Sequence, residues 1–314
     1  MASERVKKME KNKLIFMVGI PGAGKSTYAE NLAAKKKYIV HSSDNIRKEL
    51  GDINDQSRNK EVFEILHRRV KEDLAAGKNV IYDTCGIKRK DRMNFLREIK
   101  HIPCYKICVL IATPYEYCLA QNFARERQVP EDVMARFYKN FQMPCKEEGF
   151  DDIIIHYGKE EWRTYYGDVM QYVDSLLEYD QNNKHHTATL GEHMLFAGYY
   201  VLRENGNVMN DVAMAAFTHD IGKPDTRSFF NGKGEATEDA HYYSHHNVGA
   251  YKSLFFEYPN NVRKHYVALL IELHMKPLME WKQSSKAKRK DINLFGDDII
   301  NDVELLNAGD VAGH

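Results

Sequence analysis

The glycine-rich segment at residues 19–27 limits the fold of this chain more than any other feature. It reads GIPGAGKST, it follows the apolar run from Leu14 to Val18, and it precedes a stretch with the apolar spacing of a helix. A strand, a loop of the pattern GxxxxGK[ST] and a helix in this order form a phosphate-binding loop. In such a loop Lys25 reaches the outer phosphates and Ser26 binds Mg²⁺. The pattern predicts that ATP or another NTP binds through Gly19, Gly22, Gly24, Lys25, Ser26 and Thr27.

The rest of the first half continues the alternation of strand and helix. Short β-rich apolar runs without polar alternation predict buried strands, and the stretches between them have helical spacing. The predicted strands are 14–18, 38–40, 80–82, 107–112 and 153–155, and the predicted helices are 25–36, 59–76, 89–99, 114–127 and 130–140. This alternation is typical of an α/β domain with a parallel sheet flanked by helices. We place it at residues 1–157, with a lid around 120–145.

The second half lacks the apolar runs of buried strands and is rich in histidine. Helical spacing recurs at 160–180, 190–204, 208–220, 241–257, 260–274 and 297–312, and the stretches 205–207, 230–240 and 282–290 have loop composition. All but four of the 14 histidines follow residue 158. We therefore expect an all-α second domain at residues 158–314.

Composition and charge narrow the class of protein. A chain of 314 residues with 43% hydrophobic residues can bury two cores. Its 45 Lys and Arg residues balance 45 Asp and Glu residues, which excludes a uniformly basic nucleic-acid coat or a polybasic membrane anchor. Because no apolar run could span a membrane, the N-terminus lacks an export signal and the five cysteines lack CxxC spacing, we expect a cytoplasmic protein without a membrane partner.

Polar residues follow the ends of two predicted strands, where an open α/β sheet binds its ligands. After the second strand, Asp44 is a candidate to accept the proton of an attacking hydroxyl, and Arg47 to hold a substrate phosphate. Asp44 would also suit a helix N-cap. Asp83 ends the third strand and is a candidate for positioning Mg²⁺ or the substrate, or for capping. Arg125 and Arg127 precede a Pro-initiated helix and suit a lid over the transferring phosphates.

Together these motifs resemble the phage-type polynucleotide 5'-kinase family over about residues 13–157. The resemblance rests on the phosphate-binding loop, the SSDxxR segment at 42–47, Asp83-Thr84, the N-x-x-R pattern at 122–125, Val129-Pro130, and residues 148–151. It implies that Asp44 is the general base, that Arg47 contacts the nucleic-acid phosphate and that Arg125 acts on the donor phosphates. Gln121 departs from the family, because some members carry a further lid arginine there, and Arg127 is a candidate substitute.

The second half contains histidines and aspartates at the spacing of metal ligands. His219 and Asp220 begin an HDIGK segment at the end of an apolar helical stretch. Helices of a bundle can bring such side chains together, so residues on the other predicted helices are candidate ligands as well. These residues are His193, His245, His274 and Asp310. His245 and His274 also suit hydrogen-bonded core positions, since a one-metal site would not need them.

The order of these residues resembles the HD phosphohydrolase superfamily over about residues 182–314. The segment 181–186 and the pattern His245-x-x-x-Gly249-Ala250 also fit it. The resemblance implies one metal bound by His193, His219, Asp220 and Asp310. It further implies that Asp220 bridges to a second metal held by His245 and His274, and that Lys223 faces the substrate phosphate. The mixed imidazole and carboxylate set suits Mn²⁺, Fe, Co²⁺, Ni²⁺ or Zn²⁺.

A 5'-kinase joined to a phosphohydrolase suggests a bifunctional RNA end-healing enzyme. It would phosphorylate a 5'-OH end and hydrolyse a 2',3'-cyclic or 3'-phosphate end before an RNA ligase acts. One alternative is a nucleoside or nucleotide kinase with a nucleotidase-like HD domain. Another is an ATP-sensing regulator of an HD hydrolase, against which the intact Lys25, Ser26, Asp44 and Asp83 weigh. The basic stretches 86–92 and 282–290 are candidate phosphate contacts or solvated loops.

Overall fold

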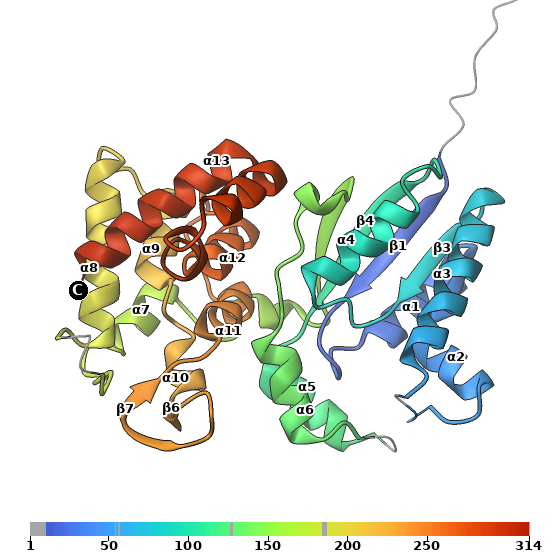
Figure 1. Ribbon diagram of the computed structural model, residues 1–314, viewed down its shortest axis with the longest axis horizontal. Helices are drawn as coiled ribbons and strands as arrows, with labels where there is room; N and C mark the ends of the chain where they lie inside the picture. The colour runs from blue at the N-terminus through green and yellow to red at the C-terminus, as the bar shows by residue number, and fades with distance from the viewer. Residues whose placement is uncertain (1–10, 54, 56, 126–127, 184–186, 314) are drawn as a thin grey trace, which may run out of the picture. The chain divides into compact units, whose positions relative to one another are not determined.

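The computed structural model describes residues 11–53, 55, 57–125, 128–183 and 187–313. The chain forms two compact units (Figure 1). The first consists of residues up to 19, 24–111 and 148–156, and the second of residues 20–23, 112–147 and 157 onward. The chain thus passes between the units several times.

The first unit is built around a sheet of five strands, in the order β2-β3-β1-β4-β5. The strands β2, β3, β1 and β4 pair in parallel with their neighbours. The elements are β1 (Lys13–Val18), α1 (Lys25–Lys35), β2 (Tyr38–Ser42), α2 (Ser43–Glu49), α3 (Asn59–Ala75), β3 (Asn79–Asp83), α4 (Arg89–Glu98), β4 (Tyr105–Ala112) and β5 (Asp152–Tyr157). The apolar residues of β1 and β3, Leu14 and Val80 among them, are buried. Those of the edge strands β2 and β5 are partly exposed, and Ile154 is 42% exposed. The α/β class predicted from the sequence is confirmed.

The register of the sheet gathers polar residues at one edge. β1 runs directly into the glycine-rich segment, and Ser42 at the end of β2 lies opposite Asp83 at the end of β3. Because parallel strands present their carboxyl ends on the same edge, the phosphate-binding loop, the start of α2 and Asp83 meet there.

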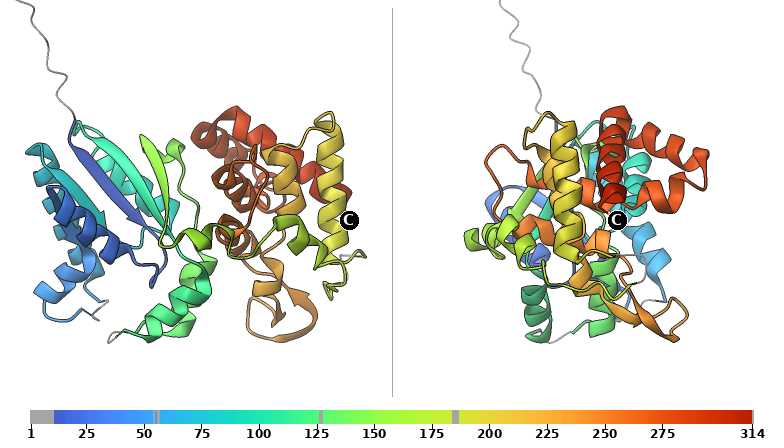
Figure 2. Two further views of the ribbon diagram at one scale, coloured as in Figure 1. Left: turned by 180° about the vertical axis from the view of Figure 1, so that it is seen from behind. Right: turned by 90° about the vertical axis from the view of Figure 1, so that its left-hand side faces the viewer.

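The second unit is mainly helical, which confirms the predicted class. Its helices are α5 (Tyr115–Phe123), α6 (Glu131–Lys139), α7 (Val169–Asp174), α8 (Leu190–Glu204), α9 (Asp211–Thr218), α10 (Lys223–Thr226), α11 (His245–Lys252), α12 (Lys264–Leu273) and α13 (Ser285–Ala312). Short 3₁₀-helices at Lys146–Glu148, Glu160–Thr164 and Ser253–Phe255 and a π-helix at Pro277–Trp281 complete the helical elements. Helices α8 and α13 lie side by side in both views of Figure 2 and bury an apolar core with α9 and α12.

Two stretches of the second unit differ from the prediction. Residues 228–241, expected to be a loop around 230–240, form an antiparallel hairpin of β6 (Ser228–Phe230) and β7 (Ala236–His241). The expected loop at 282–290 is helical from Ser285, because Ser284 caps α13 by accepting a hydrogen bond from the Ala287 N–H. Lysine, arginine and alanine, which follow the cap, are good helix formers. Gly296, with a φ of 81°, kinks α13.

The segment expected to form the lid packs within the second unit. The side chain of Asn247 in α11 donates to the Lys139 carbonyl over 2.8 Å, and the Tyr251 hydroxyl donates to the Thr113 carbonyl over 2.9 Å. The buried Glu272 carboxylate of α12 accepts the Met143 N–H over 2.6 Å. Helices α11 and α12, which begin or end at candidate metal ligands, therefore also hold residues 112–147.

Among the described residues, no helix has the length and hydropathy that crossing a bilayer requires.

Candidate functional site

The phosphate-binding loop has the backbone geometry that its glycines predict. Gly24 is the N-cap of α1 with a φ of 96°, and Gly22 has a φ of 84°. A Cβ atom at Gly22 would lie 2.3 Å from the Cys118 carbonyl oxygen, so no side chain fits there. Lys25 is buried at the start of α1. The loop is therefore shaped by positions that only glycine can occupy.

Ser26 and Asp83 form the candidate Mg²⁺ site. The Ser26 hydroxyl donates to Asp83 Oδ2 over 3.0 Å. Burial raises the pKa of the Asp83 carboxyl, while the charge of Lys25 and the hydrogen bond from Ser26 oppose this shift. A hydroxyl and a carboxylate, both oxygen donors, match the ligand preference of Mg²⁺. The residues present therefore fit a nucleotide-bound Mg²⁺ ion.

Asp44 lies in the first turn of α2 and Arg47 in its last turn, and α2 begins at the same edge of the sheet. Ser42, and not Asp44, is the N-cap: its Oγ accepts the Asp44 N–H over 3.3 Å, so the interpretation of Asp44 as a cap is wrong. The Asp44 carboxylate, whose side chain is 51% exposed, accepts a hydrogen bond from Arg47 Nη1 over 3.2 Å. Arg47 is itself buried and donates from Nη2 to Asn59 over 2.6 Å. Its buried Nε has no hydrogen-bond partner in the described structure, as expected of a donor kept for a substrate anion.

The segment predicted to carry the lid arginines follows α5. Asn122 holds this segment by two bonds to Val129, donating to its carbonyl over 2.8 Å and accepting its N–H over 2.9 Å. Arg125 is exposed on this segment, in the second unit. Arg127 lies outside the described residues, as does His186 of the 181–186 segment.

The second constellation forms where several helices begin or end. His219 directly follows α9, His245 opens α11 and His274 directly follows α12. His193 lies in the first turn of α8, whose start is fixed by a capping box between Thr189 and Glu192. Asp220 and, near the end of α13, Asp310 supply the carboxylates. All six candidate ligands are buried: His193, His219, Asp220, His245, His274 and Asp310.

Four of these residues surround one point. The Nε2 atoms of His193 and His219 lie 3.0 Å apart, and each is 3.4 Å from Asp220 Oδ2. Asp310 Oδ1 lies 3.2 Å from His193 Nε2 and 3.5 Å from His219 Nε2. His193, His219 and Asp220 thus have the spacing of a first metal site, and the Asp310 carboxylate lies against both imidazoles.

The other oxygen of Asp220 faces a second pair of histidines. Asp220 Oδ1 lies 3.1 Å from His245 Nε2 and 3.7 Å from His274 Nε2, and these two nitrogens are 3.2 Å apart. Asp220 Oδ1 is buried and takes part in no hydrogen bond in the described structure. A buried carboxylate oxygen without a hydrogen bond is the position expected of a metal ligand. The geometry therefore makes Asp220 a candidate bridge between two ions.

Backbone carbonyls orient the imidazoles. The Nδ1 atoms of His193, His219, His245 and His274 donate to the carbonyls of Gly313, Ala216, Tyr242 and Ile271, over 2.7 to 3.1 Å. A protonated Nδ1 leaves the Nε2 lone pair free for a metal, and such outer bonds fix the ring orientation. Each close pair of Nε2 atoms then needs a positive charge between them, from a proton or from a metal ion.

Burial and neighbouring charges shift the pKa values of the clustered side chains. Burial opposes the charge on His219, but the carboxylates of Asp220 and Asp310 raise its pKa to about 10. Burial likewise opposes the charge on Asp220, yet the charges of Lys223, His219 and His245 hold its pKa well below the usual range. Burial and the charge of His245 lower the pKa of His274. Protons on some of these imidazoles occupy the positions that metal ions would take.

Lys223 completes the cluster through a residue that sequence reasoning missed. Its buried ammonium donates to Asp220 Oδ2 and to Gln181 Oε1, each over 2.7 Å. Tyr242 donates in turn to the Gln181 carbonyl over 2.6 Å. In the sequence Gln181 is only the first residue of the 181–186 segment, and no local pattern indicates that its amide meets a lysine 42 positions away.

Gly222 allows the two halves of this cluster to approach. A Cβ atom there would lie 2.2 Å from the His245 carbonyl oxygen and 2.5 Å from the Gly249 nitrogen. The glycine of HDIGK therefore brings the chain that carries Asp220 against α11, which carries His245.

Comparison with known proteins identifies both halves. Residues 14–144 match the family model of the AAA domain, and residues 190–303 match that of the HD domain. The L-seryl-tRNA(Sec) kinase of Methanococcus maripaludis is 25% identical over 180 residues, which cover 54% of this chain and 66% of that kinase. The bifunctional polynucleotide phosphatase/kinase of Schizosaccharomyces pombe is 24% identical over 155 residues, which cover 47% of this chain and 34% of that protein. The chain thus spans less than two thirds of either relative.

Among solved structures, a chain of the Pnkp1/Rnl/Hen1 RNA repair complex has a TM-score of 0.37 and 18% identity, over 44% of this chain and 46% of that chain. The first match includes Ser26 and Asp83, and the second includes every candidate metal ligand except Asp310. The P-loop half implies a nucleotide with Mg²⁺, and the HD half implies a divalent metal. The chain therefore carries an AAA-type P-loop domain followed by an HD domain, in the order predicted from the sequence.

Proposed function

We propose that this chain heals both ends of broken RNA, as an ATP-dependent 5'-OH polynucleotide kinase and a metal-dependent hydrolase of 2',3'-cyclic or 3'-phosphate ends. The observation that carries the proposal is the presence of two separate phosphate-chemistry constellations in one chain, at Ser26–Asp83 and around Asp220. The relative in Schizosaccharomyces pombe, named a bifunctional polynucleotide phosphatase/kinase, combines the same two kinds of reaction. Such a chain would supply ends for an RNA ligase.

In the kinase reaction, Asp44 accepts the proton of the 5'-hydroxyl as its oxygen bonds to the γ-phosphorus and the bond to the ADP oxygen breaks. The exposure of the Asp44 carboxylate leaves it accessible to a substrate, and Arg47 holds it from one side. The free Nε of Arg47 would bind the phosphate next to the 5' nucleoside. Lys25 neutralises charge on the transferring phosphates, and Ser26 and Asp83 orient Mg²⁺. Arg125 acts on the donor phosphates.

In the hydrolase reaction, the six buried ligands would hold one ion at the first pair of histidines and one at the second, with Asp220 between. When bound, such ions supply an activated water and neutralise phosphate charge. Lys223 compensates the charge of Asp220, so that two divalent ions give the site a net positive charge suited to a phosphate. Its position beside Asp220 also lets its ammonium face a bound phosphate. The donor set suits Mn²⁺, Fe, Co²⁺, Ni²⁺ or Zn²⁺.

The test uses one RNA oligonucleotide with a 5'-OH and a 2',3'-cyclic phosphate, incubated with the full chain, radiolabelled ATP, Mg²⁺ and Mn²⁺. We expect label at the 5' end and a hydroxyl at the 3' end. Faster turnover of free nucleosides and mononucleotides than of RNA would instead favour a nucleotide-metabolism enzyme. Tight ATP binding without any phosphoryl transfer would favour an ATP-sensing regulator. Either result would overturn the end-healing proposal.

A further inference from the structure

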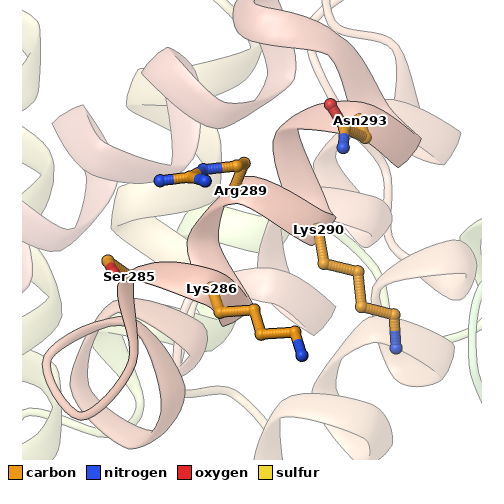
Figure 3. A pocket seen from close by; sticks show the side chains of 5 residues that line it. All are labelled: Ser285, Lys286, Arg289, Lys290 and Asn293. Atoms are coloured by element: carbon orange, nitrogen blue, oxygen red, sulfur yellow. The ribbon is translucent and has the colours of Figure 1, made fainter.

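The first half of α13 carries a stripe of positively charged side chains that line a surface cavity. Lys286, Arg289 and Lys290, with Ser285 and Asn293, line a cavity of about 480 Å³ (Figure 3). In Figure 3 the side chains of Lys286 and Lys290 extend from α13 in the same direction. The lining residues include no acid.

The helix itself creates this stripe. Positions 286, 289, 290 and 293 are related by three, four and seven residues, which places them on one helix face. Asp291, the one acid between residues 282 and 296, is buried on another face, where it accepts hydrogen bonds from Lys276 over 3.0 Å and from Trp281 Nε1 over 2.9 Å. Lys288 forms an ion pair with Glu304. The fold thus directs the acid of this segment inward and leaves the three cations of the stripe exposed.

These three cations form no stabilising ion pair within the described structure. Among the described residues, no ion pair joins Lys286, Arg289 or Lys290 to an acid. Like charges at positions i and i+4 of a helix are mildly destabilising. Because the chain has no net charge, the stripe is a local excess of positive charge and not part of a generally basic surface. Such a local excess is typical of a surface that binds a polyanion.

Its dimensions fit a nucleic-acid backbone. Lys286 and Lys290 are four residues apart, which corresponds to about 6 Å along the helix axis. Phosphates along one strand of a nucleic acid advance by about 3.4 Å each, so the stripe spans roughly two such steps, which join three consecutive phosphates. Ser285 and Asn293 add a hydroxyl and an amide, which commonly contact phosphate and sugar oxygens.

We propose that this stripe binds the phosphodiester backbone of the RNA strand whose 3' end the HD site processes. The proposal rests on the proposed function and specifies its substrate as a polynucleotide and not a mononucleotide. The stripe belongs to the same compact unit as the metal ligands. Helix α13 also carries Asp310, and His274 begins the segment that connects α12 to α13. The contacts are with phosphates, so the stripe adds affinity without base preference.

The test compares two triple variants of the full chain. One is Lys286→Ala/Arg289→Ala/Lys290→Ala. The matched control, Arg68→Ala/Arg203→Ala/Lys233→Ala, removes three exposed cations from other helices and the β6–β7 turn. Binding of a fluorescent single-stranded RNA is measured by anisotropy at several salt concentrations. Three phosphate contacts on a single strand contribute about 2 to the slope of log affinity against log salt. Between about 50 and 200 mM salt, wild-type affinity should therefore fall about 20-fold more than that of the stripe variant.

A second readout is the Michaelis constant for hydrolysis at the RNA terminus. The stripe variant should have a higher Michaelis constant than the control when the substrate is an RNA ending in a cyclic phosphate. Both variants should have the same Michaelis constant when the substrate is a nucleoside cyclic phosphate. Equal salt slopes in the stripe variant and the wild type would overturn the proposal and would favour an acidic protein as the partner of the stripe. Equal losses of RNA affinity in both triple variants would overturn it as well. If the wild type hydrolysed neither substrate, the end-healing function would fail, while the binding slopes would still decide the role of the stripe.

Discussion

Replacing Asp220 with asparagine should weaken both metal sites of the HD domain at once. In the structure its two oxygens serve different histidine pairs, with Oδ2 3.4 Å from His193 and His219 and Oδ1 3.1 Å from His245. Asparagine keeps one oxygen, offers an amide nitrogen in place of the other, and carries no charge. Whichever way the amide turns, one ion loses a ligand atom and both lose a negative charge.

The expected loss of metal affinity can be estimated from the effect of a milder change. Removing an outer partner of a metal ligand lowers metal affinity by about 10- to 100-fold. Losing a shared ligand should therefore cost more than about 100-fold at each site, which corresponds to more than about 2.8 kcal/mol. His274→Ala, by contrast, removes a ligand from the second site alone and should leave the first ion bound.

The assay is the number of Mn²⁺ ions per chain, measured by elemental analysis after equilibration with a competing chelator. We expect about two in the wild type, one in His274→Ala and none in Asp220→Asn. Because Asp220→Asn leaves the buried ammonium of Lys223 with Gln181 as its partner, it is expected to cost about 3–5 kcal/mol of stability. Kinase activity is the control for folding, and Asp220→Asn/Lys223→Met removes the uncompensated charge. Retention of one tight ion in both Asp220 variants would refute the bridging geometry.

Three further changes test other parts of the structure. Asp44→Asn should lower kinase turnover by about 10² to 10⁴ with little change in ATP affinity, measured by steady-state kinetics and calorimetry, whereas collapse of ATP binding would make the residue structural. Gly222→Ala should destabilise the second unit by about 1–3 kcal/mol, since its Cβ would lie 2.2 Å from the His245 carbonyl oxygen; an unchanged denaturant midpoint would contradict this contact. Mn²⁺ affinity should fall about tenfold per pH unit as pH is lowered from 8 to 7, because the ion must displace the proton held by His219, whose pKa is raised to about 10; a pH-independent affinity in titration calorimetry would exclude that competition.

The sequence alone was sufficient for features that depend on short-range chemistry. The phosphate-binding loop needs glycine at positions 22 and 24, and these residues have the positive φ values that the motif requires. The helix and strand order of the first half is predictable because buried parallel strands leave long apolar runs. Candidate ligands on separate helices are recognisable by residue type, and the structure brings them within contact of Asp220.

Features that depend on tertiary contacts were not predictable. The β6–β7 hairpin has short strands with weak alternation, and its backbone is held from outside, where the Ala240 N–H donates to the Asn182 carbonyl over 2.8 Å. The start of α13 has the composition of a loop, because many charged residues follow Ser284. The role of Ser284 as a helix N-cap is therefore not recognisable from the sequence. The pairing of Gln181 with Lys223 joins distant parts of the chain, and no local periodicity reports such a contact.

If two independent sites in one chain heal the two ends of an RNA, single substitutions should separate the two activities. The decisive assay compares Lys25→Ala and Asp220→Asn on one RNA with a 5'-OH and a 2',3'-cyclic phosphate. We predict that Lys25→Ala loses 5' phosphorylation and keeps 3'-end hydrolysis, and that Asp220→Asn shows the reverse. Loss of both activities in either well-folded variant, or full 3'-end hydrolysis by Asp220→Asn, would show that the two sites are not independent or that the HD site is misassigned.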